Sequence, residues 1–212
     1  MNALRTTRNK TNSLWNISLL AAVFLAALPC LPGFAQPLET DLEIGKKAPS
    51  FTLKDQNDNT VTLDALLKKG PVALVFLRST EWCSYCEFQV IQIQQNIKEI
   101  ESAGGTVVGI SYDDPQKVKA FASSHHISMP VLSDPGSRII DAYHMRSGAA
   151  RGHQEGCSKH GSFILDTNGV VRSKPYLIST QPRPTVDALL NGLKEAQKSL
   201  SDPNKDAGKN PR

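Results

Sequence analysis

A run of six apolar residues, 72–77, constrains the fold more than any other feature of the sequence. An apolar run of this length with little alternation is typical of a strand buried on both faces, as in parallel sheets that helices cover on either side. From residue 83 to residue 101 the apolar residues instead fall at roughly helical spacing, and Gly104 and Gly105 end the pattern. The sequence therefore predicts a buried strand that leads directly into one long helix.

The rest of the chain repeats this alternation of strands and helices. Asp114 and Pro115 mark the start of a helix, because a proline in the first turn has no N–H to lose. Asn168 and Gly169 predict the turn of a hairpin. The other expected elements are strands at 51–53, 61–63, 107–110, 130–132, 162–165 and 170–172 and helices at 64–67, 137–144 and 185–200. Crossover helices link parallel strands and hairpins pair antiparallel ones, so we predict an α/β domain with a mixed central β-sheet flanked by helices and an N-terminal β-hairpin extension.

The N-terminal segment, residues 1–35, has the layout of an export signal. Three basic residues and no acidic one precede a run of twelve residues, 17–28, that is apolar except for one serine. This run is shorter than the roughly 20 residues that span a bilayer, and small residues at 33 and 35 fit a cleavage site. We therefore expect an exported protein of the bacterial periplasm, with an uncleaved membrane anchor as the alternative.

Composition and charge exclude several classes of protein. The 212 residues are 40% hydrophobic and 21% charged, as in ordinary globular chains and unlike collagen or coiled coils. The formal charge is +4, but three of the 24 basic residues lie before residue 36, so the rest of the chain is close to neutral and carries no nucleic-acid footprint. We expect a signal peptide over 1–35, a single domain over 36–200 and a disordered polar tail over 201–212.

The cysteines indicate redox chemistry. Cys83 and Cys86 come directly after the buried strand and open the long helix, whereas Cys157 lies far along the chain. A helix N-terminus stabilises a thiolate at Cys83, and Cys86, one turn on, can attack a mixed disulfide formed there. We predict Cys83 as the nucleophile, Cys86 as the resolving cysteine and Trp82 as a cover that limits solvent access. A zinc half-site and an inert structural bridge are the alternatives.

Segments on both sides of the cysteines resemble those of a known family. The segment 74–86, which runs from the buried strand to the second cysteine, carries the resemblance most clearly, and the segments 45–53, 108–113, 130–134 and 163–171 extend it. Together they are similar to the AhpC/TSA (redoxin, peroxiredoxin-like) family of the thioredoxin-like superfamily, over about residues 43–198. The resemblance implies a thioredoxin-like fold.

The resemblance also implies a thiol-dependent antioxidant enzyme, although some motif positions differ. Peroxiredoxins of this group have a threonine three residues before the reactive cysteine, and Thr80 holds that position, but their upstream proline is missing. Where they carry an arginine three residues before a late aromatic residue, this chain has His160 before Phe163. The cis-proline of thioredoxins is absent too, since no proline lies between residues 136 and 174. Arg78 is a candidate for the missing positive charge.

The segment 156–160 stands outside the resemblance. We expect Cys157 and His160 to enter the strand edge that faces the helix of Cys83. Three interpretations remain open: a resolving thiol with an auxiliary histidine, a copper or zinc site completed by Cys83 and Cys86, and a surface cysteine beside a solvated histidine. The polar loop 148–156 has the length of a flap over this region.

We therefore predict an exported oxidoreductase that cycles Cys83 and Cys86 between dithiol and disulfide and reduces protein disulfides or peroxides. The alternative is a copper-binding or copper-delivery protein of the same fold that uses Cys83, Cys86, His160 and Cys157. The expected partners are a protein disulfide or a peroxide as substrate and a thiol as reductant. We expect no cofactor and no nucleic acid, and a membrane only if the signal is uncleaved.

Overall fold

The computed structural model describes residues 42–175 and 186–199. The chain divides into a unit over residues 1–36 and a unit over residues 37–212, and every described residue belongs to the second unit. The predicted signal peptide and polar tail lie outside the described residues. Among the helices that are described, none combines the length and the apolar character needed to cross a membrane.

Within the described residues, seven strands and six α-helices follow the predicted alternation. The strands are β1 (Thr52–Asp55), β2 (Thr60–Thr62), β3 (Val72–Leu77), β4 (Thr106–Ser111), β5 (Val131–Ser133), β6 (Gly161–Leu165) and β7 (Val171–Ser173). The helices are α1 (Leu63–Leu67), α2 (Ser84–Gln95), α3 (Ile97–Ser102), α4 (Pro115–Ser124), α5 (Arg138–Ala142) and α6 (Val186–Ser199), with a short 3₁₀ helix, η1, at Gly152–Gln154.

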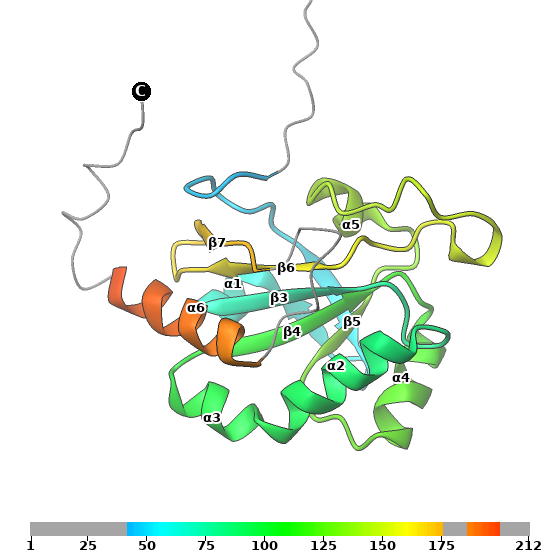
Figure 1. Ribbon diagram of the computed structural model, residues 1–212, viewed down its shortest axis with the longest axis horizontal. Helices are drawn as coiled ribbons and strands as arrows, with labels where there is room; N and C mark the ends of the chain where they lie inside the picture. The colour runs from blue at the N-terminus through cyan, green and yellow to red at the C-terminus, as the bar shows by residue number, and fades with distance from the viewer. Residues whose placement is uncertain (1–41, 176–185, 200–212) are drawn as a thin grey trace, which may run out of the picture. The chain divides into compact units, whose positions relative to one another are not determined.

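The strands form one mixed sheet in the order β2-β1-β5-β4-β3-β6-β7 (Figure 1). β3 lies parallel to β4 and antiparallel to β6, and β4 lies parallel to β5. The predicted N-terminal hairpin, β1–β2, joins the sheet through an antiparallel pairing of β1 with β5. The parallel centre and the antiparallel hairpins confirm the predicted mixed sheet.

β3 is apolar along its whole length because it contributes to both cores. Successive side chains of a strand point to opposite faces of the sheet. Ala73, Val75 and Leu77 pack into the core under α2, α4 and α6, whereas the alternate residues of β3 pack into the core on the opposite face, with α1 and α5. All six residues of β3 are buried. The continuous apolar run is thus explained by helices on both faces of the sheet.

The prediction of one long helix through residue 101 is wrong, because Asn96 separates α2 from α3. The backbone of Asn96 lies outside the helical region, with φ −108° and ψ 15°. Its side-chain amide donates to the carbonyl oxygen of Gln92 at 2.8 Å, and its backbone N–H donates to Ile93 at 3.0 Å. An asparagine that binds its own helix backbone in this way competes with regular helix geometry, and here α2 ends.

Candidate active site

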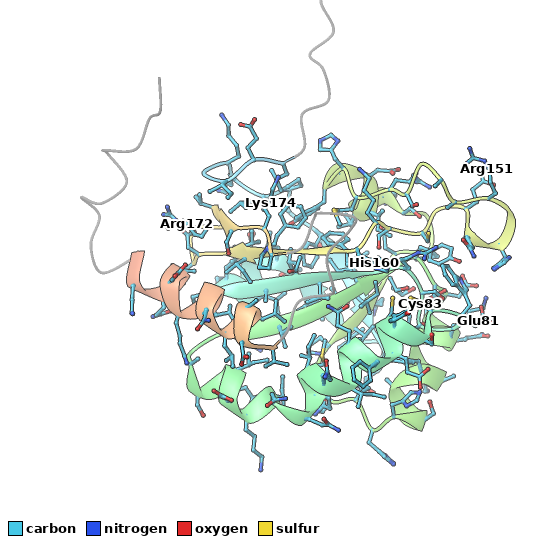
Figure 2. All side chains as sticks on the ribbon, viewed as in Figure 1. Glu81, Cys83, Arg151, His160, Arg172 and Lys174 are labelled. Carbon is cyan, nitrogen blue, oxygen red and sulfur yellow. The ribbon has the colours of Figure 1, made fainter. Side chains whose placement is uncertain are left out.

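The candidate site lies where β3 ends and α2 begins. Residues 78–82 connect the two elements, and Cys83 caps the N-terminus of α2 (Figure 2). Cys86 lies in the first turn of α2. The backbone N–H of Cys86 donates to the carbonyl oxygen of Cys83 at 2.8 Å, which closes this turn. Both side chains are buried, with 8% of Cys83 and 1% of Cys86 exposed. The fold thus places two thiols side by side at a helix N-terminus.

The two thiols differ in their surroundings. The Cys86 thiol is hydrogen-bonded to Cys83, and its sulfur accepts the backbone N–H of Arg78 at 3.3 Å. The hydrogen bond to Cys83, and after it burial, raise the pKa of Cys86 far above its ordinary value. Cys86 therefore keeps its proton, whereas Cys83 lies at the N-terminus of α2, which favours a thiolate. A protonated thiol beside a thiolate is the arrangement needed for nucleophilic attack followed by resolution.

Trp82 directly precedes Cys83, and its predicted role as a cover over the two cysteines stays a prediction. Its half-buried ring packs against the apolar core that includes Cys83 and Cys86. The indole N–H donates to the Tyr112 hydroxyl at 2.9 Å, and that hydroxyl donates to the carbonyl oxygen of His153 at 2.6 Å. Tyr112 therefore links the Trp82 ring to the loop 148–156.

Arg78 forms a second connection between the site and this loop. Its guanidinium carbon lies 4.8 Å from the centroid of the Trp82 ring, a cation–π geometry. Its Nη2 donates to Oε1 of Gln154 at 3.3 Å. Arg78 and Tyr112 thus hold the segment around η1 over Trp82, which is where the sequence led us to expect a flap.

Thr80 is buried, and its hydroxyl donates to Asp113 Oδ2 at 2.8 Å. Asp113 lies two residues after the end of β4 and is itself only 4% exposed. Sequence analysis missed Asp113, although a signal was present: the ends of neighbouring parallel strands meet at one edge of a sheet, and Asp113 follows β4 just as Thr80 follows β3. The position of Asp113 after the neighbouring strand could therefore have suggested that it lies near this turn.

Cys157 is fully buried, so the interpretation of a surface cysteine is wrong. Its backbone N–H donates to the carbonyl oxygen of Gln154, and its carbonyl oxygen accepts the backbone N–H of Ser147. Both hydrogen bonds join Cys157 to the loop that precedes it. The next residue, Ser158, donates its hydroxyl to the carbonyl oxygen of Leu77 at 2.9 Å, at the end of β3. Half-buried His160 directly precedes β6. Ser158 thus ties the segment to the end of β3, and the expected approach of Cys157 and His160 to the helix of Cys83 stays a prediction.

The predicted metal site finds no support. Within residues 42–175 and 186–199, no group of three or more His, Cys, Asp or Glu side chains is arranged so that it could hold a metal ion. A soft copper or zinc site would need Cys83 and Cys86 together with His160 or Cys157 as ligands around one point.

Comparison with known proteins places this geometry in a family. The model of the AhpC/TSA family matches residues 44–174. Peroxiredoxin Q, chloroplastic, of Arabidopsis thaliana is 36% identical over 155 residues, which cover 72% of this chain and 67% of that protein. Alkyl hydroperoxide reductase E of Mycobacterium tuberculosis (strain ATCC 25618 / H37Rv) is 30% identical over 133 residues, which cover 62% of this chain and 83% of that protein.

Solved structures of similar fold agree. Enterococcus faecalis AhpC superimposes with a TM-score of 0.67 at 19% identity, covering 78% of this chain and 98% of that one. Peroxidoxin BcpB from Mycobacterium tuberculosis superimposes with a TM-score of 0.60 at 24% identity, covering 76% and 97%. These likenesses confirm the predicted thioredoxin-like fold. Because the family model spans more than half of the sequence and the relatives are peroxiredoxins, the chain belongs to the AhpC/TSA family and is a peroxiredoxin-like enzyme.

Proposed function

We propose that this protein is a thiol peroxidase in which Cys83 reduces a hydroperoxide and Cys86 resolves the oxidised sulfur. The observation that carries the proposal is the Cys86 thiol hydrogen-bonded to Cys83 at the N-terminus of α2. The family membership and the names of the relatives, a peroxiredoxin and an alkyl hydroperoxide reductase, support peroxide as the substrate.

The chemistry proceeds in three steps. In the first, the Cys83 thiolate attacks one oxygen of the hydroperoxide, the O–O bond breaks, and the other oxygen leaves as an alcohol or water once protonated by solvent; Cys83 becomes a sulfenic acid. In the second, the Cys86 sulfur attacks the Cys83 sulfur, an S–S bond forms, and the hydroxide leaves with the Cys86 proton as water. In the third, an external thiol reductant supplies two electrons and two protons and restores both thiols.

Resolution needs no rearrangement of a distant segment. Residues three apart at the start of a helix lie on the same side of it, and the two thiols are already in hydrogen-bond contact. The reacting sulfurs therefore stay within the first turn of α2 throughout the cycle. We infer that the disulfide forms faster than a second peroxide can reach the sulfenic acid.

Peroxide consumption with dithiothreitol as reductant tests the proposal. We expect turnover by the unaltered protein and none by Cys83→Ser. The matched variant is Cys157→Ser, which removes another buried cysteine and should keep turnover because Cys86 still resolves Cys83. Absence of turnover in the unaltered protein would refute the peroxidase proposal. Loss of turnover in Cys157→Ser would instead identify Cys157 as the resolving cysteine.

A second candidate function is thiol–disulfide exchange with proteins, which the spacing of two cysteines at a helix start also favours. Reduction of insulin disulfides in the same buffer separates the two functions. Peroxide turnover without insulin reduction supports the peroxidase. Insulin reduction without peroxide turnover supports an exchanger that uses the same two cysteines.

We also propose export, which rests on the sequence of residues 1–35 alone. The mass of the protein recovered from cells of its source would test this. A chain that begins close to residue 36 in the exported fraction supports a cleaved signal. A chain that keeps residues 1–35 and is found only inside the cell contradicts export.

A further inference from the structure

We propose that Asp113 is the positioning residue of this site: its buried carboxylate fixes the turn that carries Cys83 and makes the Thr80 hydroxyl an acceptor for the hydrogen of the peroxide. The inference rests on the proposed peroxidase function and goes beyond it. Asp113 acts through Ser79 and Thr80, the two residues that follow Arg78 in the turn.

The carboxylate of Asp113 collects the polar groups of the turn. Oδ2 accepts hydrogen bonds from the backbone N–H of Thr80, from the Thr80 hydroxyl at 2.8 Å and from the Ser111 hydroxyl at 2.7 Å. Oδ1 accepts from the Ser79 hydroxyl at 3.0 Å. Ser79 and Ser111 are fully buried, and Thr80 and Asp113 nearly so. Several hydrogen bonds that converge on one buried carboxyl group hold their donors in place, so this cluster fixes the path of the backbone through the turn.

Ser79 connects the Asp113 carboxylate to the backbone just before Cys83. While its hydroxyl donates to Asp113, the same oxygen accepts the backbone N–H of Glu81 at 2.9 Å and of Trp82 at 3.3 Å. The backbone of three consecutive residues, 80–82, is therefore tied to one carboxylate, and Cys83 comes next. The position of the nucleophile at the start of α2 depends on this arrangement.

Asp113 is itself held from two neighbouring strands. Its backbone N–H donates to the Ser111 hydroxyl at 3.3 Å, at the end of β4. Its carbonyl oxygen accepts the Ser133 hydroxyl at 2.6 Å, at the end of β5. The ends of β3, β4 and β5 are thus joined through a single residue. A carboxylate fixed from both sides orients its partners precisely enough to affect a reaction rate.

The orientation of the Thr80 hydroxyl has a chemical consequence. A hydroxyl has one hydrogen to donate, and Thr80 donates it to Asp113. Its remaining lone pairs only accept, so Thr80 does not donate to the Cys83 thiolate and does not weaken it as a nucleophile. A hydroperoxide carries one O–H donor. We infer that this O–H donates to the Thr80 hydroxyl while Cys83 attacks the peroxide. The hydrogen bond moves no proton and no electron, so the attack of Cys83 on the hydroperoxide proceeds as written above.

The test compares two reagents that react with the same sulfur. Hydrogen peroxide needs the oriented Thr80 acceptor, whereas iodoacetamide, which alkylates any thiolate, does not. The rate constant of Cys83 with each reagent is measured over a range of pH for the unaltered protein and for Asp113→Asn. We expect the peroxide rate constant to fall about tenfold or more, as for loss of a hydrogen bond to a charged group, and the iodoacetamide rate constant to change by less than about twofold.

Asp134→Asn is the matched control. Asp134 is another buried aspartate, placed after β5 as Asp113 is after β4, and its carboxylate accepts the backbone N–H groups of Arg138, Ile139 and Ile140 instead of the turn. We expect it to leave the ratio of the two rate constants unchanged. A similar fall in the ratio of the peroxide rate constant to the iodoacetamide rate constant in Asp134→Asn would overturn the proposal, because it would show a general effect of destabilisation.

Thr80→Val supplies the second half of a double-mutant cycle. If Asp113 acts through Thr80, Thr80→Val lowers the peroxide rate constant about as much as Asp113→Asn, and the combined variant loses little more. Thr80→Ser, which keeps the hydroxyl, should retain most of the rate. Additive losses in the combined variant would show that Asp113 does not act through Thr80.

The remaining outcomes are also decisive. An unchanged peroxide rate constant in Asp113→Asn, or equal losses with both reagents, overturns the positioning role. If Asp113→Asn does not fold, Ser111→Ala removes one of the bonds that hold the carboxylate and should give the same selective loss for peroxide, about threefold or more; no selective loss overturns the proposal. An unaltered protein that alkylates readily but ignores peroxide refutes the proposed function itself.

Discussion

At the scale of single residues, the site depends on two thiols with opposite tasks. Cys83 must lose its proton to attack, and Cys86 must keep its proton until the sulfenic acid has formed. The structure separates the two by contact and burial, because Cys86 is almost completely buried and hydrogen-bonded to Cys83. The helix N-terminus favours negative charge at Cys83.

Cys86→Ser should separate attack from resolution. The variant keeps the Cys83 nucleophile but has no sulfur in the first turn of α2 to form a disulfide. We expect one rapid reaction with peroxide and then accumulation of Cys83 with one or two added oxygen atoms, visible in the intact mass. The unaltered protein at the same peroxide dose should show loss of two hydrogens instead. Equal overoxidation of both proteins would contradict a resolving role for Cys86.

The raised pKa of Cys86 makes the stability of the reduced protein depend on pH. In the unfolded chain this thiol titrates near its ordinary value of 9.0, whereas the hydrogen bond to Cys83 and burial raise the pKa in the fold. The contribution is fully present below 9.0, and above it the unfolded state releases a proton that the folded state retains. The free energy of unfolding therefore falls as pH rises above 9.0.

Urea denaturation in the presence of reductant, from neutral pH upward, measures this dependence. Cys86→Ala has no thiol to titrate at this position and should show a flatter curve, even though it begins less stable. Identical slopes for the two proteins above 9.0 would show that Cys86 does not carry the pH dependence.

At the scale of elements, the loop 148–156 depends on Tyr112. The Tyr112 hydroxyl joins the indole of Trp82 to the backbone of His153. Tyr112→Phe removes both hydrogen bonds and keeps the ring, so we expect faster amide hydrogen exchange around η1 with little change in overall stability. Tyr143→Phe is the matched control, since its hydroxyl donates to Pro49 and not to this loop. Faster exchange around η1 in both variants, or in neither, would contradict this role of Tyr112.

The backbone approaches itself closely at two glycines, Gly70 before β3 and Gly104 before β4. A Cβ at Gly70, before β3, would collide with the carbonyl oxygen of Gly104, before β4, and Gly70 has φ +144°. Backbone atoms cannot move aside easily, so Gly70→Ala should lower the free energy of unfolding by about 2 kcal/mol or more. Gly148→Ala has open space around the new methyl and should change it by less than about 0.5 kcal/mol. Comparable losses in urea denaturation would refute the close approach.

At the scale of the whole molecule, much of the fold could be predicted because its patterns are local. The apolar run of β3, the proline at the start of α4 and the Asn168-Gly169 turn each indicate one element from a few neighbouring residues. The alternation of those elements then leaves a mixed sheet with a parallel centre. The cysteine pair could be placed for the same reason, since it follows a strand and opens a helix within the same short segment.

The features that could not be predicted depend on contacts between residues distant in sequence, or on a side chain that competes with the regular hydrogen bonds of a helix. The end of α2 at Asn96 depends on whether an asparagine side chain binds the helix backbone, and helical periodicity continues across it. The burial of Cys157 accompanies a hydrogen bond from the next residue, Ser158, to Leu77 at the end of β3, 81 residues earlier in the chain. The bonds of Asp113 to Ser79 and Thr80 likewise join residues more than 30 positions apart.

The measurement that tests the central claim most directly is a single turnover of the fully reduced protein with one equivalent of hydrogen peroxide, followed by peptide mass mapping. The account predicts that the peroxide is consumed and that the product is an intramolecular disulfide between Cys83 and Cys86, with Cys157 still a thiol. Peroxide left unconsumed, or a disulfide that joins Cys157 to Cys83, would contradict it.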